Sequence, residues 1–123
     1  MSTTDAAVNA SNALTTWAKG DHGMETAVEI TLDSIIRRYF IDHTGAATSW
    51  VQWSPTRHSA RPRWADLLAA GGQSSGERFL LALCENIAHG PEDSPNLNLG
   101  GLWNLDQGNA GAVLDALNRH LRR

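Results

Sequence analysis

Apolar residues recur at helical spacing along most of this chain, and the longest such run covers residues 24–41. Its apolar positions fall on one face of a helix: Val28, Leu32, Ile35, Ile36 and Tyr39. A strand over 27–33 is the alternative, because apolar and polar residues alternate there. The helical pattern runs much longer than the alternation, so we predict a helix over 24–41.

Four further segments show helical periodicity together with start or stop signals: 4–19, 62–70, 75–89 and 107–122. Pro62 suits the first position of the second segment. Ser74 and Glu77 have the spacing of a capping box before the third, and Asp106 can cap the last. In the last helix the residues expected to face inward are Val113, Leu114, Leu117 and Leu121. Between the last two helices we expect a turn-rich loop over 91–98 and a short helical turn over 99–104.

Residues 42–61 break the helical pattern. Gly45, Pro55 and several serines and threonines mark a long irregular segment. Within it, residues 49–54 have side chains typical of a short β-strand. No clear partner strand is evident, so an extended segment lying across the helices is the alternative.

These elements predict a mostly α fold: one small helical domain over residues 1–123, built as a compact bundle of about five helices with one irregular segment. The expected core comprises Val28, Leu32, Ile35, Phe79, Leu83, Ile87, Val113 and Leu117. The apolar stripe of the first helix is mostly alanine. We therefore expect residues 1–20 to form a loosely docked N-terminal helix.

Composition narrows the class of protein. No run of 18 apolar residues is present, so we expect no membrane partner. Cys84 is the only cysteine, which excludes an internal disulfide, and the N-terminus lacks the pattern of a signal peptide. We expect a cytoplasmic protein. Arginines outnumber lysines nine to one, a bias that favours a bacterial or phage source.

Charge is distributed unevenly along the chain. Residues 34–64 sum to +4, whereas residues 1–33 sum to −4 and residues 65–118 to −6. The basic part also holds three of the five tryptophans. The predicted partner-binding residues all come from this part: Trp50, Trp53, Arg57, Arg61, Arg63 and Trp64.

Three interpretations of these residues stay open. Trp and Arg are enriched in protein-binding hot spots. Aromatic rings beside arginines also suit base stacking with phosphate contact. Alternatively, the tryptophans belong to the core and the arginines pair with Glu25, Glu29 and Asp66. We predict a non-catalytic interaction module, such as a small adaptor, inhibitor or regulator, that binds a protein partner or itself. The alternative is a nucleic-acid-binding regulator that uses residues 50–64.

The sequence predicts no catalytic residue, no cofactor and no metal. Cys84 lies on the apolar face of its helix, where a buried thiol is unreactive. The histidines are scattered, and no pair has the spacing of zinc ligands: His22, His43, His58, His89 and His120. A metal site would have to be assembled in three dimensions.

Overall fold

The computed structural model describes residues 3–90, 92 and 97–121, and side chains from residue 10 onward. The chain is mostly helical, as predicted, and it also contains a small antiparallel sheet of two strands. The helices are α1 (Thr3–Ala18), α2 (His22–Asp33), α3 (Arg37–Phe40), α4 (Trp64–Ala70), α5 (Ser75–His89), the 3-10 helix η2 (Leu99–Asn104) and α6 (Gln107–Leu121). The strands are β1 (Val51–Trp53) and β2 (Ala60–Pro62).

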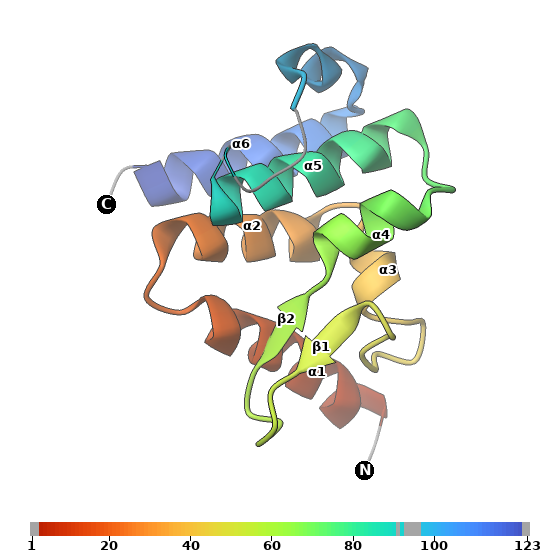
Figure 1. Cartoon of the computed structure of the whole chain (residues 1–123), viewed down its shortest axis with the longest axis vertical. Helices are drawn as coiled ribbons and strands as arrows, with labels where there is room; N and C mark the ends of the chain where they lie inside the picture. The colour runs from red at the N-terminus through yellow and green to blue at the C-terminus, as the bar shows by residue number, and fades with distance from the viewer. Residues whose placement is uncertain (1–2, 91, 93–96, 122–123) are drawn as a thin grey trace.

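Helix α2 lies at the centre of the molecule. It packs against α5 and α6 on one side and against α1 on the other (Figure 1). Its Ala27 and Ile30 side chains are fully buried. The hairpin of β1 and β2 lies against α1, and α4 packs on α5. Because α2 is covered on two sides, it can hold polar groups that face both α1 and α6.

The helix predicted over 24–41 is broken in the structure. Helix α2 ends at Asp33, Ser34 has an extended backbone (φ −115°, ψ 177°), and α3 starts three residues later. Ile35 and Ile36 lie between the two helices, so helical periodicity does not place them on a common face. The break buries Ile36 completely and leaves Ile35 45% exposed. A continuous helix and a core role for Ile35 were therefore wrong, and so was the alternative of a strand over 27–33.

Helix α5 confirms its prediction from start to end. The Ser74 hydroxyl accepts a hydrogen bond from the Glu77 N–H, and the Glu77 carboxylate accepts one from the Ser74 N–H at 2.8 Å. This capping box satisfies two backbone groups at the helix start. Phe79 and Leu83, on the predicted apolar face, are buried.

Helix α6 has its predicted cap but not its predicted inner face. The Asp106 carboxylate accepts a hydrogen bond from the Asn109 N–H at 2.8 Å. Val113 and Ala116 are the buried residues of this helix, while Leu114 is 64% and Leu121 79% exposed. The small alanine side chain lets α6 approach α2 closely. The prediction that Leu114 and Leu121 face inward was therefore wrong.

The irregular segment contains the β-hairpin. β1 pairs antiparallel with β2, Val51 opposite Pro62 and Trp53 opposite Ala60. The partner strand went unnoticed in the sequence because it has three residues and ends in a proline. Pro62 therefore lies in β2 and does not start a helix; α4 begins two residues later. At the tip of the hairpin Arg57 has φ 59°, a left-handed conformation that non-glycine residues rarely adopt.

Helix α1 ends at a glycine with φ 97°, as its sequence predicts. Four of its described apolar residues are buried: Ala10, Ala13, Leu14 and Ala18. How firmly this helix is docked stays a prediction. Among the described residues, no helix is long and apolar enough to cross a membrane. Most of the predicted loop over 91–98 lies outside the described residues.

Candidate functional site

Trp64 is a core residue in the structure. Its side chain is fully buried, and its indole N–H donates a hydrogen bond to the Thr31 hydroxyl at 2.9 Å. Its ring also packs edge-on against Trp17, with ring centroids 5.9 Å apart. The indole is not accessible to a partner, which corrects its place among the predicted binding residues.

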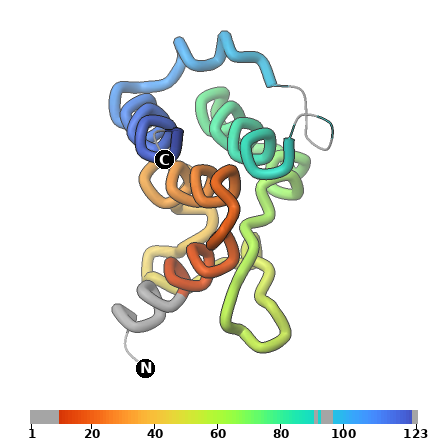
Figure 2. Tube along the Cα trace, turned by 90° about the vertical axis from the view of Figure 1, so that its left-hand side faces the viewer, coloured from red at the N-terminus to blue at the C-terminus, as the bar shows by residue number. Residues whose placement is uncertain are grey.

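The other five predicted residues are gathered on the hairpin and its flanks. We call Trp50, Trp53, Arg57, Arg61 and Arg63 the hairpin surface. The Arg57 guanidinium lies 4.5 Å from the centre of the Trp53 ring, and the Arg63 guanidinium lies 5.5 Å from that of Trp50. Arg57 is exposed at the tip, which projects from the body of the molecule (Figure 2).

The arginines of the hairpin surface differ in their partners. Arg63 pairs with Asp66 at 3.0 Å and donates to the Ser49 carbonyl. Arg61 donates to the Gln52 side chain at 2.7 Å. In the described part of the chain, neither Arg57 nor Arg61 has an acidic partner. The expected internal ion pairs are thus found for Arg63 alone.

The expected acidic partners lie elsewhere. Glu29 pairs with Arg119, and Glu25 lies 3.8 Å from His22. Both carboxylates belong to α2, which faces α6 at this point (Figure 1). Glu29 therefore pairs with the last turns of α6 and not with an arginine of the hairpin.

The two tryptophan rings of the hairpin surface have little free face. Trp50 and Trp53 are half-buried and pack against the core, and each carries a guanidinium over its ring. Base stacking needs an open aromatic face. The accessible parts of Trp50 and Trp53 are therefore ring edges and the guanidinium groups stacked on them.

Sequence reasoning missed the exposed apolar side chains of η2. Leu99 is 62%, Leu102 37% and Trp103 89% exposed. The helix is held on α5 through Gly101, where an added Cβ would lie 2.4 Å from the Phe79 ring. The signal was present as leucines and a tryptophan in a short turn beside two glycines. It did not stand out because scattered exposed apolar residues are common.

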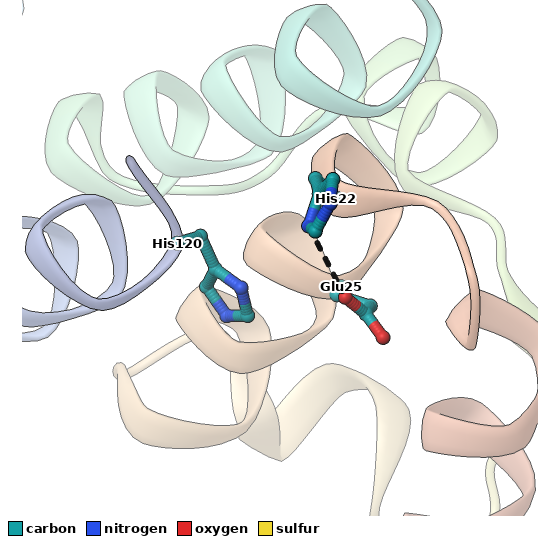
Figure 3. A group of neighbouring side chains, drawn as sticks. All are labelled: His22, Glu25 and His120. Carbon is teal, nitrogen blue, oxygen red and sulfur yellow. Dashed lines mark ion pairs between the residues drawn. The ribbon is translucent and has the colours of Figure 1, made fainter. Parts of the chain in front are cut away.

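A second feature missed from the sequence is a group of polar side chains between α2 and the end of α6. We call it the histidine pocket; its members are His22, Glu25, Glu29 and His120. Figure 3 shows His120 reaching from α6 toward the first turns of α2, where His22 and Glu25 stand one turn apart. Three of these residues, Glu25, Glu29 and His120, line a cavity of about 340 Å³ that reaches α1 at Thr15, and His22 lies outside its lining. No sequence signal marked it, because His22 and His120 come from opposite ends of the chain.

The histidine pocket holds donor atoms suited to a metal ion. His22, Glu25 and His120 each offer one ligand atom, and these atoms all lie within 4.8 Å of one another. The His120 side chain is only 8% exposed, yet neither of its ring nitrogens has a hydrogen-bond partner among the residues that the structure describes. The Oε2 atom of Glu29 is likewise buried and has no hydrogen-bond partner among them.

Cys84 is unsuited to nucleophilic chemistry. It is fully buried, and its Sγ lies 3.5 Å from the Ala27 carbonyl oxygen. Burial raises the pKa of the Cys84 thiol to about 12. At neutral pH the thiol is protonated, and the thiolate is the reactive form.

Comparison with protein-family models, with curated proteins and with solved structures gives no match for this chain. A function for it has to be argued from the hairpin surface, η2 and the histidine pocket.

Proposed function

We propose that this chain is a non-catalytic protein-interaction module whose hairpin surface binds an acidic segment of a partner protein. One observation carries the proposal. Arg57 is exposed at the tip of the hairpin, stacked on Trp53 at 4.5 Å, and has no acidic partner among the described residues. We also place the module in the cytoplasm of a bacterium or its phage, as the composition favours.

The hairpin tip is held in one conformation. The Ser54 N–H donates to the Ser59 carbonyl at 2.9 Å, and the Arg57 N–H donates to the Ser54 carbonyl at the same distance. The left-handed backbone at Arg57 is part of this turn. A side chain that is already ordered loses less conformational entropy on binding, which favours affinity.

Charge complementarity selects an acidic partner. The hairpin from Val51 to Pro62 has two arginines and no acidic residue, although the whole chain has a net charge of −3. A local basic surface on an acidic protein attracts acidic partners and orients the protein toward them. The same surface could attract the acidic flanks of a second copy, which the remaining, acidic surface repels. Arginine also binds carboxylates through two parallel hydrogen bonds. Self-association through the acidic flanks of a second copy is an outcome that the test distinguishes.

A nucleic-acid partner is the alternative, and the covered faces of Trp50 and Trp53 count against it. Only phosphate contacts from Arg57 and Arg61 would remain. Binding of that kind weakens steeply as salt rises and shows little preference for sequence. Titration with mixed oligonucleotides at two salt concentrations tests this alternative directly.

The test uses the double variant Arg57→Ser/Arg61→Ser. A partner is captured from a lysate with the immobilised chain, identified by mass spectrometry, purified and titrated by calorimetry. We expect the variant to bind it at least about tenfold more weakly, a loss of about 1.4 kcal/mol. The control Lys19→Ser/Arg78→Ser removes the same charge outside the hairpin and should keep the affinity. Equal weakening in both variants, or none in either, would contradict the proposal, and sedimentation of the chain alone detects self-association.

A further inference from the structure

The chain carries a second site whose chemistry differs from that of the hairpin surface. We propose that the histidine pocket binds one zinc(II) ion through His22, Glu25 and His120. The proposal is independent of the interaction module, because it rests on α2 and α6 and involves no residue of the hairpin.

The three ligand atoms are close to the geometry that zinc requires. Zinc binds imidazole nitrogen and carboxylate oxygen at about 2.0–2.2 Å, which puts ligand atoms of a tetrahedral site roughly 3.3 Å apart. His22 Nδ1 and Glu25 Oε1 are 3.8 Å apart, and all three ligand atoms lie within 4.8 Å of one another. The His22 side chain is 66% exposed, so solvent leaves room for it to turn toward the other two ligands.

His120 supplies the independent observation. Its side chain is more than nine-tenths buried and lines the pocket, but in the described part of the chain neither ring nitrogen has a hydrogen-bond partner. Buried polar side-chain atoms nearly always have one, and an exception calls for an explanation such as an ion. A zinc ion bound to one nitrogen removes this deficit.

Glu29 positions the His120 ring. Its Oε1 atom lies 3.6 Å from His120 Nε2, slightly beyond hydrogen-bond length, and Arg119 pairs with the same carboxylate. Histidines that bind metals usually donate the other ring N–H to a carboxylate. With Nε2–H directed at Glu29, Nδ1 is the nitrogen that binds zinc.

The ligand set selects zinc over the common alkaline-earth ions. Two imidazoles and a carboxylate suit zinc, whereas magnesium and calcium take oxygen ligands. His120 also lies in the last turn of α6, where the helix dipole favours a cation.

A bound zinc ion would fasten α6 to α2. Among its described residues, α6 buries only Val113 and Ala116 against the rest of the molecule. A zinc ion shared by His120 and the first turn of α2 adds a link at the far end of that contact. Zinc bound at this site would therefore strengthen the docking of α6 on α2.

The test uses the full chain without a histidine tag, freed of metal by a chelator and titrated with zinc chloride in a calorimeter. We expect one zinc per chain and a rise in melting temperature of several degrees. Magnesium chloride should give neither. His22→Ala, at an exposed position, should weaken zinc binding by at least about tenfold, and so should Glu25→Gln and His120→Asn. All three ligands contribute to zinc affinity, so the loss of any one should weaken binding.

His43→Ala/His58→Ala is the matched control, since both histidines are exposed and lie outside the pocket. It should bind zinc as the unaltered chain does. Zinc binding that is absent, or that survives unchanged in His22→Ala and Glu25→Gln, would overturn the proposal. If His120→Asn fails to fold, the other two variants still decide, because neither replaces a buried side chain.

Discussion

The hairpin surface and the histidine pocket both gather polar side chains, but they differ in how these side chains are satisfied. In the hairpin surface, each arginine has a partner close in sequence: Trp53 for Arg57, Gln52 for Arg61, and Asp66 for Arg63. In the pocket, groups from both ends of the chain meet, and Glu29 Oε2 and the two ring nitrogens of His120 are buried with no hydrogen-bond partner among the described residues.

The difference separates two kinds of binding. A buried polar atom without a partner costs free energy, so a small ligand that completes its bonds is strongly favoured. A surface with partnered side chains has no such deficit. Such a surface gains binding free energy only when a large partner surface replaces the water on it, and a protein partner offers such a surface. This contrast supports the proposals of a metal ion for the pocket and a protein partner for the hairpin surface.

The largest expected effect is the loss of stability on replacing Trp64. Trp64 is close in sequence to the hairpin surface but belongs to the core. Trp64→Ala should lower the free energy of unfolding by about 3–5 kcal/mol, because it empties a buried ring site and leaves Thr31 without its donor. Urea denaturation measures the change. Trp103→Ala is the control: Trp103 is 89% exposed, so its loss should change stability by less than about 0.5 kcal/mol. Similar effects for both would mean that Trp64 is not a core residue.

The second prediction concerns Glu77, a buried carboxylate that is fully satisfied and so contrasts with Glu29. Burial alone would raise the pKa of Glu77, but hydrogen bonds from the Ser74 backbone, Arg38, Tyr39 and the Ser74 hydroxyl lower it to about 2. The folded protein holds this proton less tightly than the unfolded chain, whose pKa is near the ordinary 4.5. The resulting stability is present above pH 4.5 and is lost as the pH falls toward 2.

We expect Glu77 to contribute about 2 kcal/mol to this acid dependence, since Arg38 is 63% exposed and solvent screens its charge. Urea unfolding at pH values from 7 to 2.5 measures it. Glu77→Gln keeps an oxygen that can accept from Ser74 but has no charge to titrate. Its stability should change less between pH 5 and 2.5 than that of the unaltered chain. An identical loss in both would assign the acid dependence to other carboxylates.

Local signals predicted much of the fold. The capping box at Ser74 and the cap at Asp106 depend on neighbours within three residues, so the sequence contains the whole cause. The break at Ser34 and the inner face of α6 depend on residues that are distant in sequence. Leu114 is exposed because α6 docks on α2 through Val113 and Ala116, and the shape of α2 determines which face of α6 fits. Periodicity identifies an apolar stripe, but tertiary packing selects its centre.

The candidate sites divide in the same way. The hairpin residues are close in sequence, so charge and aromatic content singled them out, and their binding role stays a prediction. The prediction for Trp64 was wrong, because its side chain is fully buried. Its burial follows from Thr31 and Trp17, both distant in sequence. The histidine pocket joins residues from α2 and the last turn of α6. Spacing rules for metal ligands apply within one segment, so they could not predict it.

The third prediction tests whether the polar deficit of the pocket is real. His120→Leu removes the two unpartnered nitrogens and keeps an apolar side chain of similar size. In the chelator-treated protein it should leave the free energy of unfolding unchanged or raise it by about 1 kcal/mol. The stabilisation by zinc should disappear. A clear loss of stability without zinc would show that the His120 ring already makes favourable polar contacts, and the contrast with the hairpin surface would fail.

The smallest expected effect concerns the arginines of the hairpin surface themselves. Arg57→Ser/Arg61→Ser should change the free energy of unfolding by less than about 0.5 kcal/mol, because neither side chain has an acidic partner among the described residues. Arg63→Ser should cost more, up to about 1 kcal/mol, since it breaks the contacts with Asp66 and the Ser49 carbonyl. Urea denaturation of the two variants gives both values. If the double variant is the less stable one, Arg57 and Arg61 hold the hairpin together, and their exposure at its tip no longer argues for a partner.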